Sequence, residues 1–347
     1  MDGGSGLNLA LVGWAADSGV GREFISASRH LPVSSAFVFS NPLKPTRRDL
    51  VKVPCFYSTG TNLIREMNIF LDRHKPDTIL TWEVPGSWDF PILWHSKGIH
   101  WVHMVHWDWF ESKRVSVWKK ADLLAPNRMC QEALKNTCGL ESRLIPVPVD
   151  TDKFQFKLRK RATNFISVFA YGGSHERRSL KEIFQAWEGM ESPPGLTIFA
   201  QKRPGELESL KPVKGIEVLL GNAPDPWILY EGADIAVQPS RYEGVGVSLL
   251  EAQSCGVPVI AIAAPPMDEV APDLPVSVKE TVSIEIMGKK IPSHIPSVES
   301  IAERIRNLKG QDIQELSHRA RNRVEKEYSW QALKPRWIEI LEGKHGL

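Results

Sequence analysis

The sequence predicts an α/β protein with two doubly wound domains. Short apolar runs that are typical of buried strands alternate with amphipathic segments, as in parallel sheets whose strands are joined by crossover helices. The alternation is interrupted after residue 150 and then starts again. A chain of 347 residues is also long enough for two cores of ordinary size. We therefore expect a first domain over residues 1–150, a second over 151–330, and a C-terminal helix over 331–347.

The first domain is predicted to alternate regularly from its start. A buried strand leads through a glycine turn into a helix, and glycine or proline closes the later helices. The predicted strands cover residues 7–14, 36–40, 77–83, 99–106, 121–127 and 142–150. The predicted helices cover residues 19–31, 60–76, 90–98 and 128–139.

The second domain repeats the alternation and ends in helices. Its predicted strands cover residues 165–173, 195–201, 215–221, 233–240 and 257–264. Its predicted helices cover residues 179–190, 225–232 and 248–256, and then 297–310, 312–328 and 331–343. Domains of this class bind ligands at the carboxyl ends of their strands, so the loops at those ends are the places to look for chemistry.

The charge balance argues against nucleic acid as a partner. The 43 basic and 41 acidic residues leave a net charge of +2. Basic runs at residues 44–48 and 157–161 are interpreted as solvated surface. The alternative is a patch for an acidic substrate or for the membrane surface, which would be a peripheral contact.

Composition favours a cytoplasmic location. The four cysteines form no CxxC pair and have no zinc-finger spacing, so reduced thiols are expected. No apolar run is long enough to cross a bilayer. The N-terminal residues 1–14 lack a basic region and are interpreted as the first strand, not as a signal peptide.

The stretch SRYEGVGVSLLEAQSCGVPVI, residues 240–260, carries the strongest functional signal. It follows a predicted strand and leads through two glycines into a helix. Glycine allows positive φ and a close approach of ligand to backbone. A helix N-terminus offers free N–H groups that favour an anion such as a diphosphate. The amides concerned are those of Gly244, Val245, Gly246, Val247 and Ser248.

Two acidic residues in this stretch, Glu243 and Glu251, need another explanation, because a carboxylate repels phosphate. As hydrogen-bond acceptors they suit hydroxyl groups. Glu251, inside the helix, is expected to accept hydrogen bonds from the ribose hydroxyls, as acidic residues do in dinucleotide folds. Glu243, before the glycines, is expected to face the transferred sugar. The alternative is that Glu251 only complements the helix dipole while Glu243 is solvated.

Residues 243–261 resemble the E-x7-E signature of retaining GT-B glycosyltransferases of family 4, the glycosyl transferases group 1. In that family, too, the signature follows a strand that ends in Pro-Ser, and it continues with a segment similar to SCGVPV. The resemblance extends to three further segments: GVGREF at 19–24, LIPVPVDTDKF at 144–154 and EYSW at 327–330. It therefore covers most of the chain.

The donor-phosphate segment departs from that family. The family pattern GR-x(4)-KG would place its arginine at Gly173 and its lysine at Arg178. Arg178, together with Arg177, is expected to neutralise a diphosphate, since a guanidinium fork suits phosphate. The alternative is that both arginines are surface charges at the start of a helix.

The stretch IHWVHMVHWDWF, residues 99–110, contains three histidines. On a strand, His100 and His106 face one way and His103 the other, which argues against a metal site formed by all three. His106 falls at the carboxyl end of the strand. The resemblance implies that a histidine near this position lies close to the reacting sugar and the acceptor. The alternative is a structural histidine, which is our expectation for His100 and His103.

Two further features of the first domain have both a functional and a structural interpretation. Gly19 and Gly21 resemble a phosphate-cradling turn, but they also suit tight packing of strand against helix. Of the 12 tryptophans, eight lie in the first 118 residues. Some of them could stack on sugars or cover a lipid tail, although core packing explains each one singly. Those near the strand ends are Trp82, Trp88, Trp107 and Trp109.

The resemblance implies a function. A hexosyl group would move from a nucleoside diphosphate sugar, UDP- or GDP-linked, to a hydroxyl of a glycan, a lipid-linked or a small-molecule acceptor. Configuration at the anomeric carbon would be retained, with the leaving phosphate as base and without a metal or other cofactor. The second domain would bind the donor, the first the acceptor, and the last helix, from about Gln331, would return to the first. Alternatives on the same fold are a sugar-nucleotide hydrolase or epimerase, and an inactive nucleotide-sugar-binding module.

Overall fold

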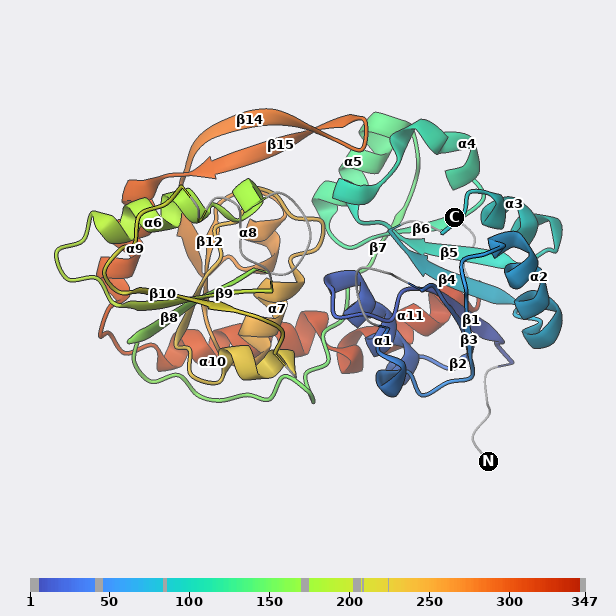
Figure 1. The fold of residues 1–347 in the computed structure, drawn as a ribbon, viewed down its shortest axis with the longest axis horizontal. Coiled ribbons are helices and arrows are strands. Elements are labelled where there is room, and N and C mark those ends of the chain that lie inside the picture. Colours follow the sequence, from blue (N-terminus) through green and yellow to red (C-terminus); the bar gives the residue numbers. More distant parts are fainter. Residues whose placement is uncertain are drawn as a thin grey trace. The chain divides into compact units, whose positions relative to one another are not determined.

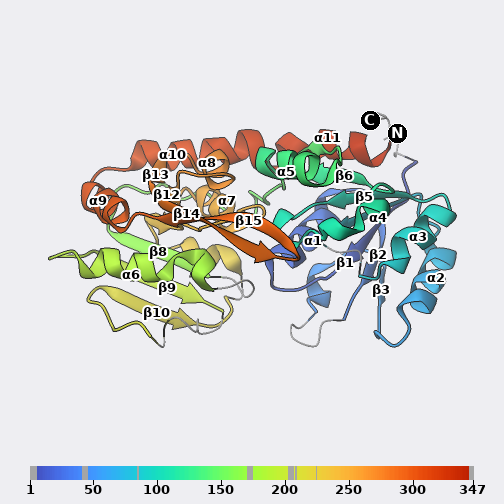
Figure 2. The same cartoon turned by 90° about the horizontal axis from the view of Figure 1, so that it is seen from above.

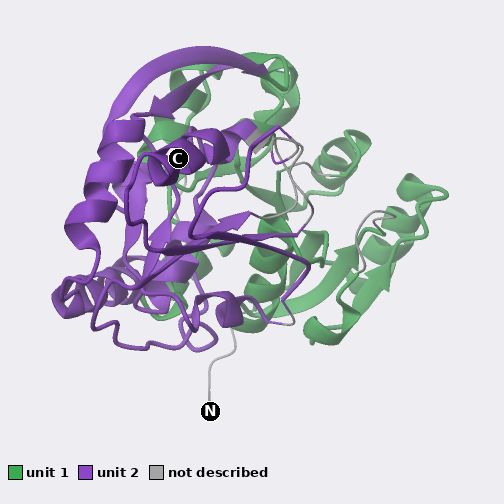
Figure 3. Cartoon of the chain, turned by 60° about the vertical axis from the view of Figure 1, so that its left-hand side comes forward, with its two compact units in different colours: residues 1–148, 286–289, 330–347 green, residues 149–285, 290–329 purple. Residues whose placement is uncertain are grey.

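A computed structural model describes residues 6–40, 46–83, 86–169, 175–201, 207, 209–223 and 225–343. The described residues contain two large parallel sheets, each flanked by helices (Figures 1 and 2). The chain divides into two compact units, which Figure 3 distinguishes by colour. Unit 1 comprises Met1–Pro148, Ile286–Lys289 and Trp330–Leu347, and unit 2 comprises Val149–Glu285 and Lys290–Ser329.

The sheet of unit 1 has seven parallel strands in the order β3-β2-β1-β4-β5-β6-β7. The strand order reverses between β1 and β4, and the loops after these two strands therefore lead to opposite sides of the sheet. Such a switch point is where open α/β sheets bind ligands. The strands are β1 (Leu9–Gly13), β2 (Val33–Val38), β3 (Cys55–Tyr57), β4 (Thr78–Trp82), β5 (His100–Met104), β6 (Asp122–Ala125) and β7 (Arg143–Leu144).

The helices of unit 1 begin and end as the sequence chemistry dictates. Ser18 and Asn127 cap α1 and α5 with their side chains, and Gly139 ends α5 in the left-handed conformation. The last helix, α11, belongs to unit 1, where Thr78 Oγ1 donates to Leu341 O (3.1 Å). The helices are α1 (Gly19–His30), α2 (Leu63–His74), α3 (Asp89–Ser96), α4 (Val115–Trp118), α5 (Arg128–Cys138) and α11 (Trp330–Leu341).

Aromatic side chains fill the core of unit 1. Phe37 lies 5.3 Å from Phe56 and 5.5 Å from Phe70 between ring centroids, and Trp101 stacks on Trp118 at 5.6 Å. Offset and edge contacts of this kind stabilise a core beyond the area that they bury. Much of the tryptophan enrichment in the first 118 residues therefore serves packing.

Unit 2 contains a six-stranded parallel sheet in the order β10-β9-β8-β11-β12-β13, whose switch point lies between β8 and β11. Its strands are β8 (Asn164–Phe169), β9 (Gly195–Ala200), β10 (Ile216–Leu220), β11 (Ile235–Val237), β12 (Val259–Ile262) and β13 (Leu274–Val276). Its helices are α6 (Leu180–Glu188), α7 (Val247–Ser254), α8 (Met267–Val270), α9 (Val298–Leu308) and α10 (Gln314–Arg323). The predicted fold class, two doubly wound α/β sheets, is confirmed.

A two-stranded hairpin, β14 (Val278–Ile286) and β15 (Lys289–Pro296), was not predicted. Met287 and Gly288 form its turn with φ of 51° and 70°, as type I′ hairpin turns require. Lys289, counted with unit 1, is buried there and donates to Phe110 O (2.8 Å) and Asp108 O (3.4 Å).

One basic run differs from its predicted role as solvated surface. Arg159, in the run 157–161, is buried. Its guanidinium donates to Glu231 O (2.9 Å) and to Cys255 O (3.2 Å), the C-cap of α7. Carbonyls at a helix C-terminus attract a cation, which explains the position of this side chain.

The structure contains no membrane-spanning candidate among the residues that it describes, because none of their helices combines enough length with enough apolar character.

Candidate functional site

Two loops come together at the switch point of the unit 2 sheet. One follows β8 and contains the short helix His175–Arg178, and the other follows β11. Ser179 Oγ donates to Pro239 O (2.8 Å), and Arg241 N donates to Arg177 O (2.8 Å). These hydrogen bonds join the predicted phosphate-binding arginines to the predicted acidic loop. Gly173, the position of the family's arginine, lies outside the described residues.

Arg177 and Arg178 share one carboxylate. Arg177 Nη2 donates to one oxygen of Glu243, and Arg178 Nη1 donates to the other. Arg178 Nη1 also donates to Ser240 Oγ (3.0 Å), and Arg177 Nε to the carbonyl of Tyr242 (3.1 Å). The side chains of the arginines are 12% and 15% exposed, and that of Glu243 only 4%. The three groups thus form a nearly buried, fixed cluster with more positive than negative charge.

The electrostatics of this cluster favour an ionised Glu243. Burial raises the pKa of its carboxyl, but the charges of Arg177 and Arg178 lower it further than burial raises it, so the net shift is downward. Glu243 was expected to be either solvated or facing the sugar. It is buried, with both oxygens bound to guanidinium groups, so the solvated alternative is wrong, while the role facing the sugar stays a prediction.

The glycine loop then turns into α7. Gly246 is the N-cap of this helix and takes a φ of 80°, a conformation that favours glycine. Ser248, in the first turn, has a buried Oγ that finds no partner among the described residues. Glu251, in the second turn, is buried. The residues predicted to bind a donor, Gly244 to Ser248 and Glu251, therefore surround the start of one helix beside the switch point.

A second cluster lies at the switch point of the unit 1 sheet. His106, which follows β5, has its Nε2 3.1 Å from Glu23 Oε2 of α1. Its Nδ1 lies 3.4 Å from Oε1 of Glu83, the residue after β4. The side chain of His106 is 7% exposed. Two carboxylates from separate elements thus hold the predicted histidine.

The two carboxylates determine the charge of this histidine. Burial lowers the pKa of His106, but Glu23 and Glu83 together raise it well above the ordinary value of 6.5. Burial raises the pKa of Glu23, an effect that His106 partly opposes. The cluster therefore holds its protons tightly, and His106 is an imidazolium at neutral pH.

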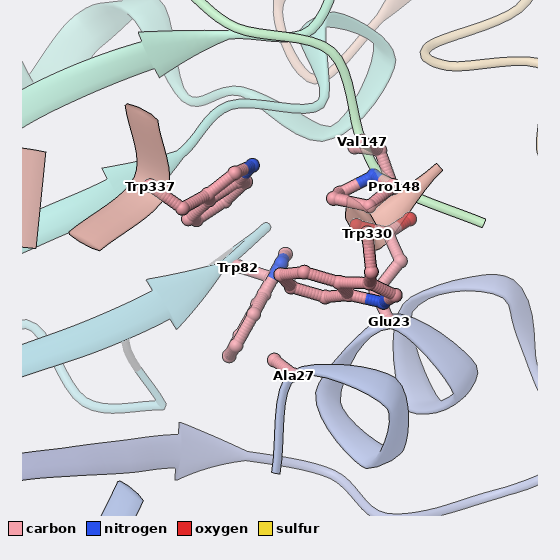
Figure 4. Close-up of a pocket in the computed structure, with 7 residues that line it drawn as sticks. All are labelled: Glu23, Ala27, Trp82, Val147, Pro148, Trp330 and Trp337. Carbon is pink, nitrogen blue, oxygen red and sulfur yellow. The ribbon is translucent and has the colours of Figure 1, made fainter. Parts of the chain in front are cut away.

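Glu23 also lines a small pocket within unit 1, shown in Figure 4. The other lining residues are Ala27, Trp82, Val147, Pro148, Trp330 and Trp337. The cavity has a volume of about 10 Å³, which is roughly the space of one water molecule. It is too small to hold a substrate, so the exposed side of the cluster is the one that matters for ligands.

The other histidines of the stretch have structural contacts. His100 Nε2 lies 3.0 Å from Asp122 Oδ2. His103 is buried with its Nδ1 2.7 Å from Thr81 Oγ1, and burial lowers its pKa to about 3. Both contacts agree with the structural role expected for these two residues.

Of the four tryptophans near the strand ends, two are core residues. Trp82 and Trp107 are buried, and Trp82 makes an edge contact with Phe24. The ring of Trp88 lies under the guanidinium of Arg114 at 4.6 Å. Trp109, with 43% exposure, is the one of the four that remains open to stack on a ligand.

The glycine loop of unit 1 shows why one of its glycines is needed. A Cβ on Gly21 would lie 2.1 Å from the carbonyl oxygen of Ala16, whereas a Cβ on Gly19 would meet nothing within 4 Å. Gly21 therefore permits the close approach of α1 to the chain that follows β1. This is the packing interpretation of the motif.

Glu23 and Glu83 were not among the residues predicted from sequence. Glu83 is the last residue of the predicted strand 77–83, so the position at a strand's carboxyl end that singled out His106 also applies to it. Glu23 carries no such signal, because an acid within an amphipathic helix is usually solvated. Within the described ranges, no group of three or more His, Cys, Asp or Glu side chains is arranged to hold a metal ion.

Comparison with known proteins found a family model that matches part of the chain and solved structures with a similar fold. The model of the family described as glycosyl transferases group 1 matches residues 206–327. Sucrose-phosphate synthase from Thermosynechococcus elongatus has a similar structure with a TM-score of 0.72 and 16% identity, covering 97% of this chain and 99% of that one. No curated protein matches the sequence.

Two further solved structures are also similar to this chain. Anabaena HepE in complex with UDP-glucose gives a TM-score of 0.73 at 13% identity, covering 97% of this chain and all (100%) of that one. A glycosyltransferase from Rickettsia africae gives 0.72 at 13% identity, covering 98% and 99%. At such identities the likeness establishes the fold, which is the two-domain GT-B architecture of glycosyltransferases.

Proposed function

We propose that the protein is a glycosyltransferase that moves a hexosyl group from a nucleoside diphosphate sugar to a hydroxyl group of an acceptor. The observation that carries the proposal is the arginine cluster at the switch point of unit 2. Arg177 and Arg178 are held side by side by Glu243, with an excess of positive charge. Paired guanidinium groups fixed at the carboxyl edge of a sheet suit the diphosphate of a sugar nucleotide.

The rest of the donor site follows from α7. The amides of residues 244–248 receive the phosphate oxygens, since they lead into a helix N-terminus. Glu251 accepts hydrogen bonds from the ribose hydroxyls. Anabaena HepE was solved with UDP-glucose, so UDP-sugars are the first donors to test and GDP-sugars the second.

Unit 1 supplies the acceptor side, with His106 and the loop of Gly19 and Gly21 at its switch point. The resemblance to retaining enzymes leads us to propose front-side attack. The acceptor oxygen bonds to the anomeric carbon as the bond to the diphosphate breaks, and the departing phosphate oxygen takes the hydroxyl proton. Arg177 and Arg178 stabilise the charge that develops on this leaving group, which is the role that a metal ion plays elsewhere.

Product analysis tests the proposal. We would incubate the protein with UDP-glucose or GDP-mannose and a panel of monosaccharides and octyl glycosides, and determine the anomeric configuration of the product by NMR. Arg178→Ala should lower kcat/KM by about 10- to 100-fold, as expected when a hydrogen bond to a charged group is lost. Arg319→Ala, an exposed arginine on α10, is the control and should stay within about twofold.

The other functions on this fold give different products. Release of free sugar without transfer would identify a hydrolase, and a changed sugar nucleotide would identify an epimerase. Binding of nucleotide without any turnover would identify a binding module. Inverted configuration in a transfer product would overturn the front-side mechanism while leaving the transferase assignment intact.

A further inference from the structure

His106 has no ring nitrogen left to contact a substrate. Its Nε2 is within hydrogen-bond distance of Glu23, and its Nδ1 faces Glu83 at 3.4 Å. An imidazolium has two N–H donors, and here each is directed at a carboxylate. His106 can therefore affect a ligand only through one of these two acids.

The two acids differ in their access to solvent. The side chain of Glu23 is 4% exposed, while that of Glu83 is 21% exposed. A carboxylate has two oxygens with about four lone-pair sites, so one bond to His106 leaves Glu83 able to accept more. Of the three groups in the cluster, Glu83 is the one that can both contact His106 and reach a ligand.

The backbone of Glu83 is unusual. Its φ is 57°, in the left-handed region that residues other than glycine, asparagine and aspartate seldom adopt. Strain of this kind persists where the surrounding structure imposes it, and it is concentrated at functional sites. Glu83 directly follows β4 (Thr78–Trp82), which borders the switch point, so this conformation sets the direction of its side chain at the edge where such sheets bind ligands.

The charged groups around Glu83 come from several elements and orient its side chain. The imidazolium faces Glu83 from the end of β5, with buried Glu23 of α1 on its other side. Asp108, two residues further on, adds negative charge near Glu23. His103 of β5 contributes no charge at neutral pH, because burial lowers its pKa to about 3.

We infer that Glu83 is the residue of unit 1 that contacts the acceptor. Its carboxylate accepts a hydrogen bond from an acceptor hydroxyl, while His106 and Glu23 act through it as positioning residues. The inference rests on the proposed glycosyl transfer and assigns a specificity for hydroxyl donors, such as sugars, to this edge of the sheet. In this arrangement Glu83, and not His106, makes the direct contact with the acceptor.

Two variants of Glu83 test the inference. Glu83→Gln leaves an amide whose oxygen faces the imidazolium and whose NH₂ group faces the ligand, so the polarity toward a hydroxyl is reversed. Glu83→Asn also removes the charge, but asparagine tolerates the left-handed region, so this variant relieves the backbone strain that Glu83→Gln keeps. The matched control is Asp122→Asn, which removes the carboxylate that pairs with His100 on the same sheet.

The first readout is kinetic, with the acceptor chosen by screening monosaccharides and octyl glycosides against UDP-glucose and GDP-mannose. Glu83→Gln and Glu83→Asn should raise the KM for the acceptor by about tenfold or more, the cost of a lost charged hydrogen bond, and leave the KM for the donor within about twofold. Asp122→Asn should change neither. An acceptor KM within twofold of wild type in both Glu83 variants would overturn the inference.

The second readout does not depend on activity. In ¹⁵N-histidine-labelled protein, His106 should titrate well above pH 6.5 in the wild type, and its titration should move to lower pH in both Glu83 variants but stay unchanged in the control Asp122→Asn. If the wild type transfers a sugar to no acceptor, the proposed function fails, and the titration of His106 alone decides whether Glu83 interacts with it. Unchanged titration of His106 would then show that Glu83 does not interact with it.

Discussion

Replacing Glu243, the acid that begins the E-x7-E segment, by glutamine tests whether this residue holds Arg177 and Arg178 in place or contacts the nucleotide directly. In the structure its carboxylate binds Arg177 and Arg178, and all three side chains are at most 15% exposed. Removing one partner of a buried ion pair costs about 3–5 kcal/mol, because the other charge is left buried and uncompensated. Glutamine keeps one acceptor oxygen, so we expect a loss of about 3 kcal/mol, the lower end of this range.

The assay is thermal unfolding with and without UDP. For a domain the size of unit 2, a loss of 3 kcal/mol corresponds to a fall of about 6–12 °C in Tm. The diphosphate replaces the missing negative charge in the variant, so UDP should raise the Tm of Glu243→Gln by more than it raises that of the wild type. Glu182→Gln, which breaks the neighbouring buried pair with Arg241 (2.8 Å), is the control. It should destabilise unit 2 without enlarging the effect of UDP.

The pH dependence of stability shows whether ionised Glu243, through its bonds to Arg177 and Arg178, stabilises unit 2. The pKa of Glu243 is lowered below its ordinary value of 4.5, so its contribution is fully present above that pH and is lost as pH falls through the folded-state pKa. Wild type and Glu243→Gln should therefore differ in free energy of unfolding at pH 7 and converge as the pH falls below 4.5 and through the folded-state pKa. A smaller effect of UDP on the variant than on the wild type would contradict this expectation, since Glu243 would then contribute directly to nucleotide binding.

Four other substitutions have clear expected outcomes. Gly21→Ala places a Cβ 2.1 Å from a backbone oxygen and should lower the free energy of unfolding by about 3 kcal/mol, while Gly19→Ala, with open space, should change it by less than about 1 kcal/mol in urea titrations. Lys289→Met removes the donor to Phe110 O (2.8 Å) and should destabilise unit 1 by about 1–3 kcal/mol in calorimetry. The raised pKa of His106 means that its stabilisation is fully present below pH 6.5 and is lost as pH rises through the folded-state value, so His106→Gln should differ from wild type more at pH 6 than at pH 9. Equal losses for the two glycine variants, no loss for the lysine variant, or a difference that grows with pH would contradict these expectations.

The fold class was predictable because periodicity is local. The alternation of apolar runs with amphipathic segments specifies parallel strands and crossover helices, and the structure contains both sheets. The hairpin β14–β15 carries an alternating pattern with a Met287-Gly288 turn, but it interrupts the strand–helix rhythm and was not predicted.

The pairing within the sites was less predictable than the residues themselves. The acidic loop and both arginines were identified by motif, but the bonds of Glu243 to Arg177 and Arg178 join positions 66 and 65 residues apart. Only the order of the strands brings these loops together. Glu23 was missed for the same reason, since it lies 83 residues from His106.

The burial of Arg159 is a further feature that the sequence does not predict. Within the run 157–161 its charge predicts solvent exposure, yet it lies against the carbonyls of Glu231 and Cys255. A charged side chain can be buried wherever the fold supplies carbonyl acceptors, and the sequence does not reveal where those acceptors lie.

We propose that unit 2 binds a nucleoside diphosphate through Glu251 and the loop that precedes it. The most direct test is a thermal-shift panel of UDP, GDP, ADP and their sugars on wild type, Glu251→Ala and the control Glu303→Ala, an exposed position on α9. One nucleotide, at a hundredfold excess over its Kd, should stabilise the wild type and the control by about 2.7 kcal/mol and should have no such effect on Glu251→Ala. A folded wild type that no nucleotide stabilises, or equal stabilisation of Glu251→Ala, would show that Glu251 does not bind a nucleotide in this way.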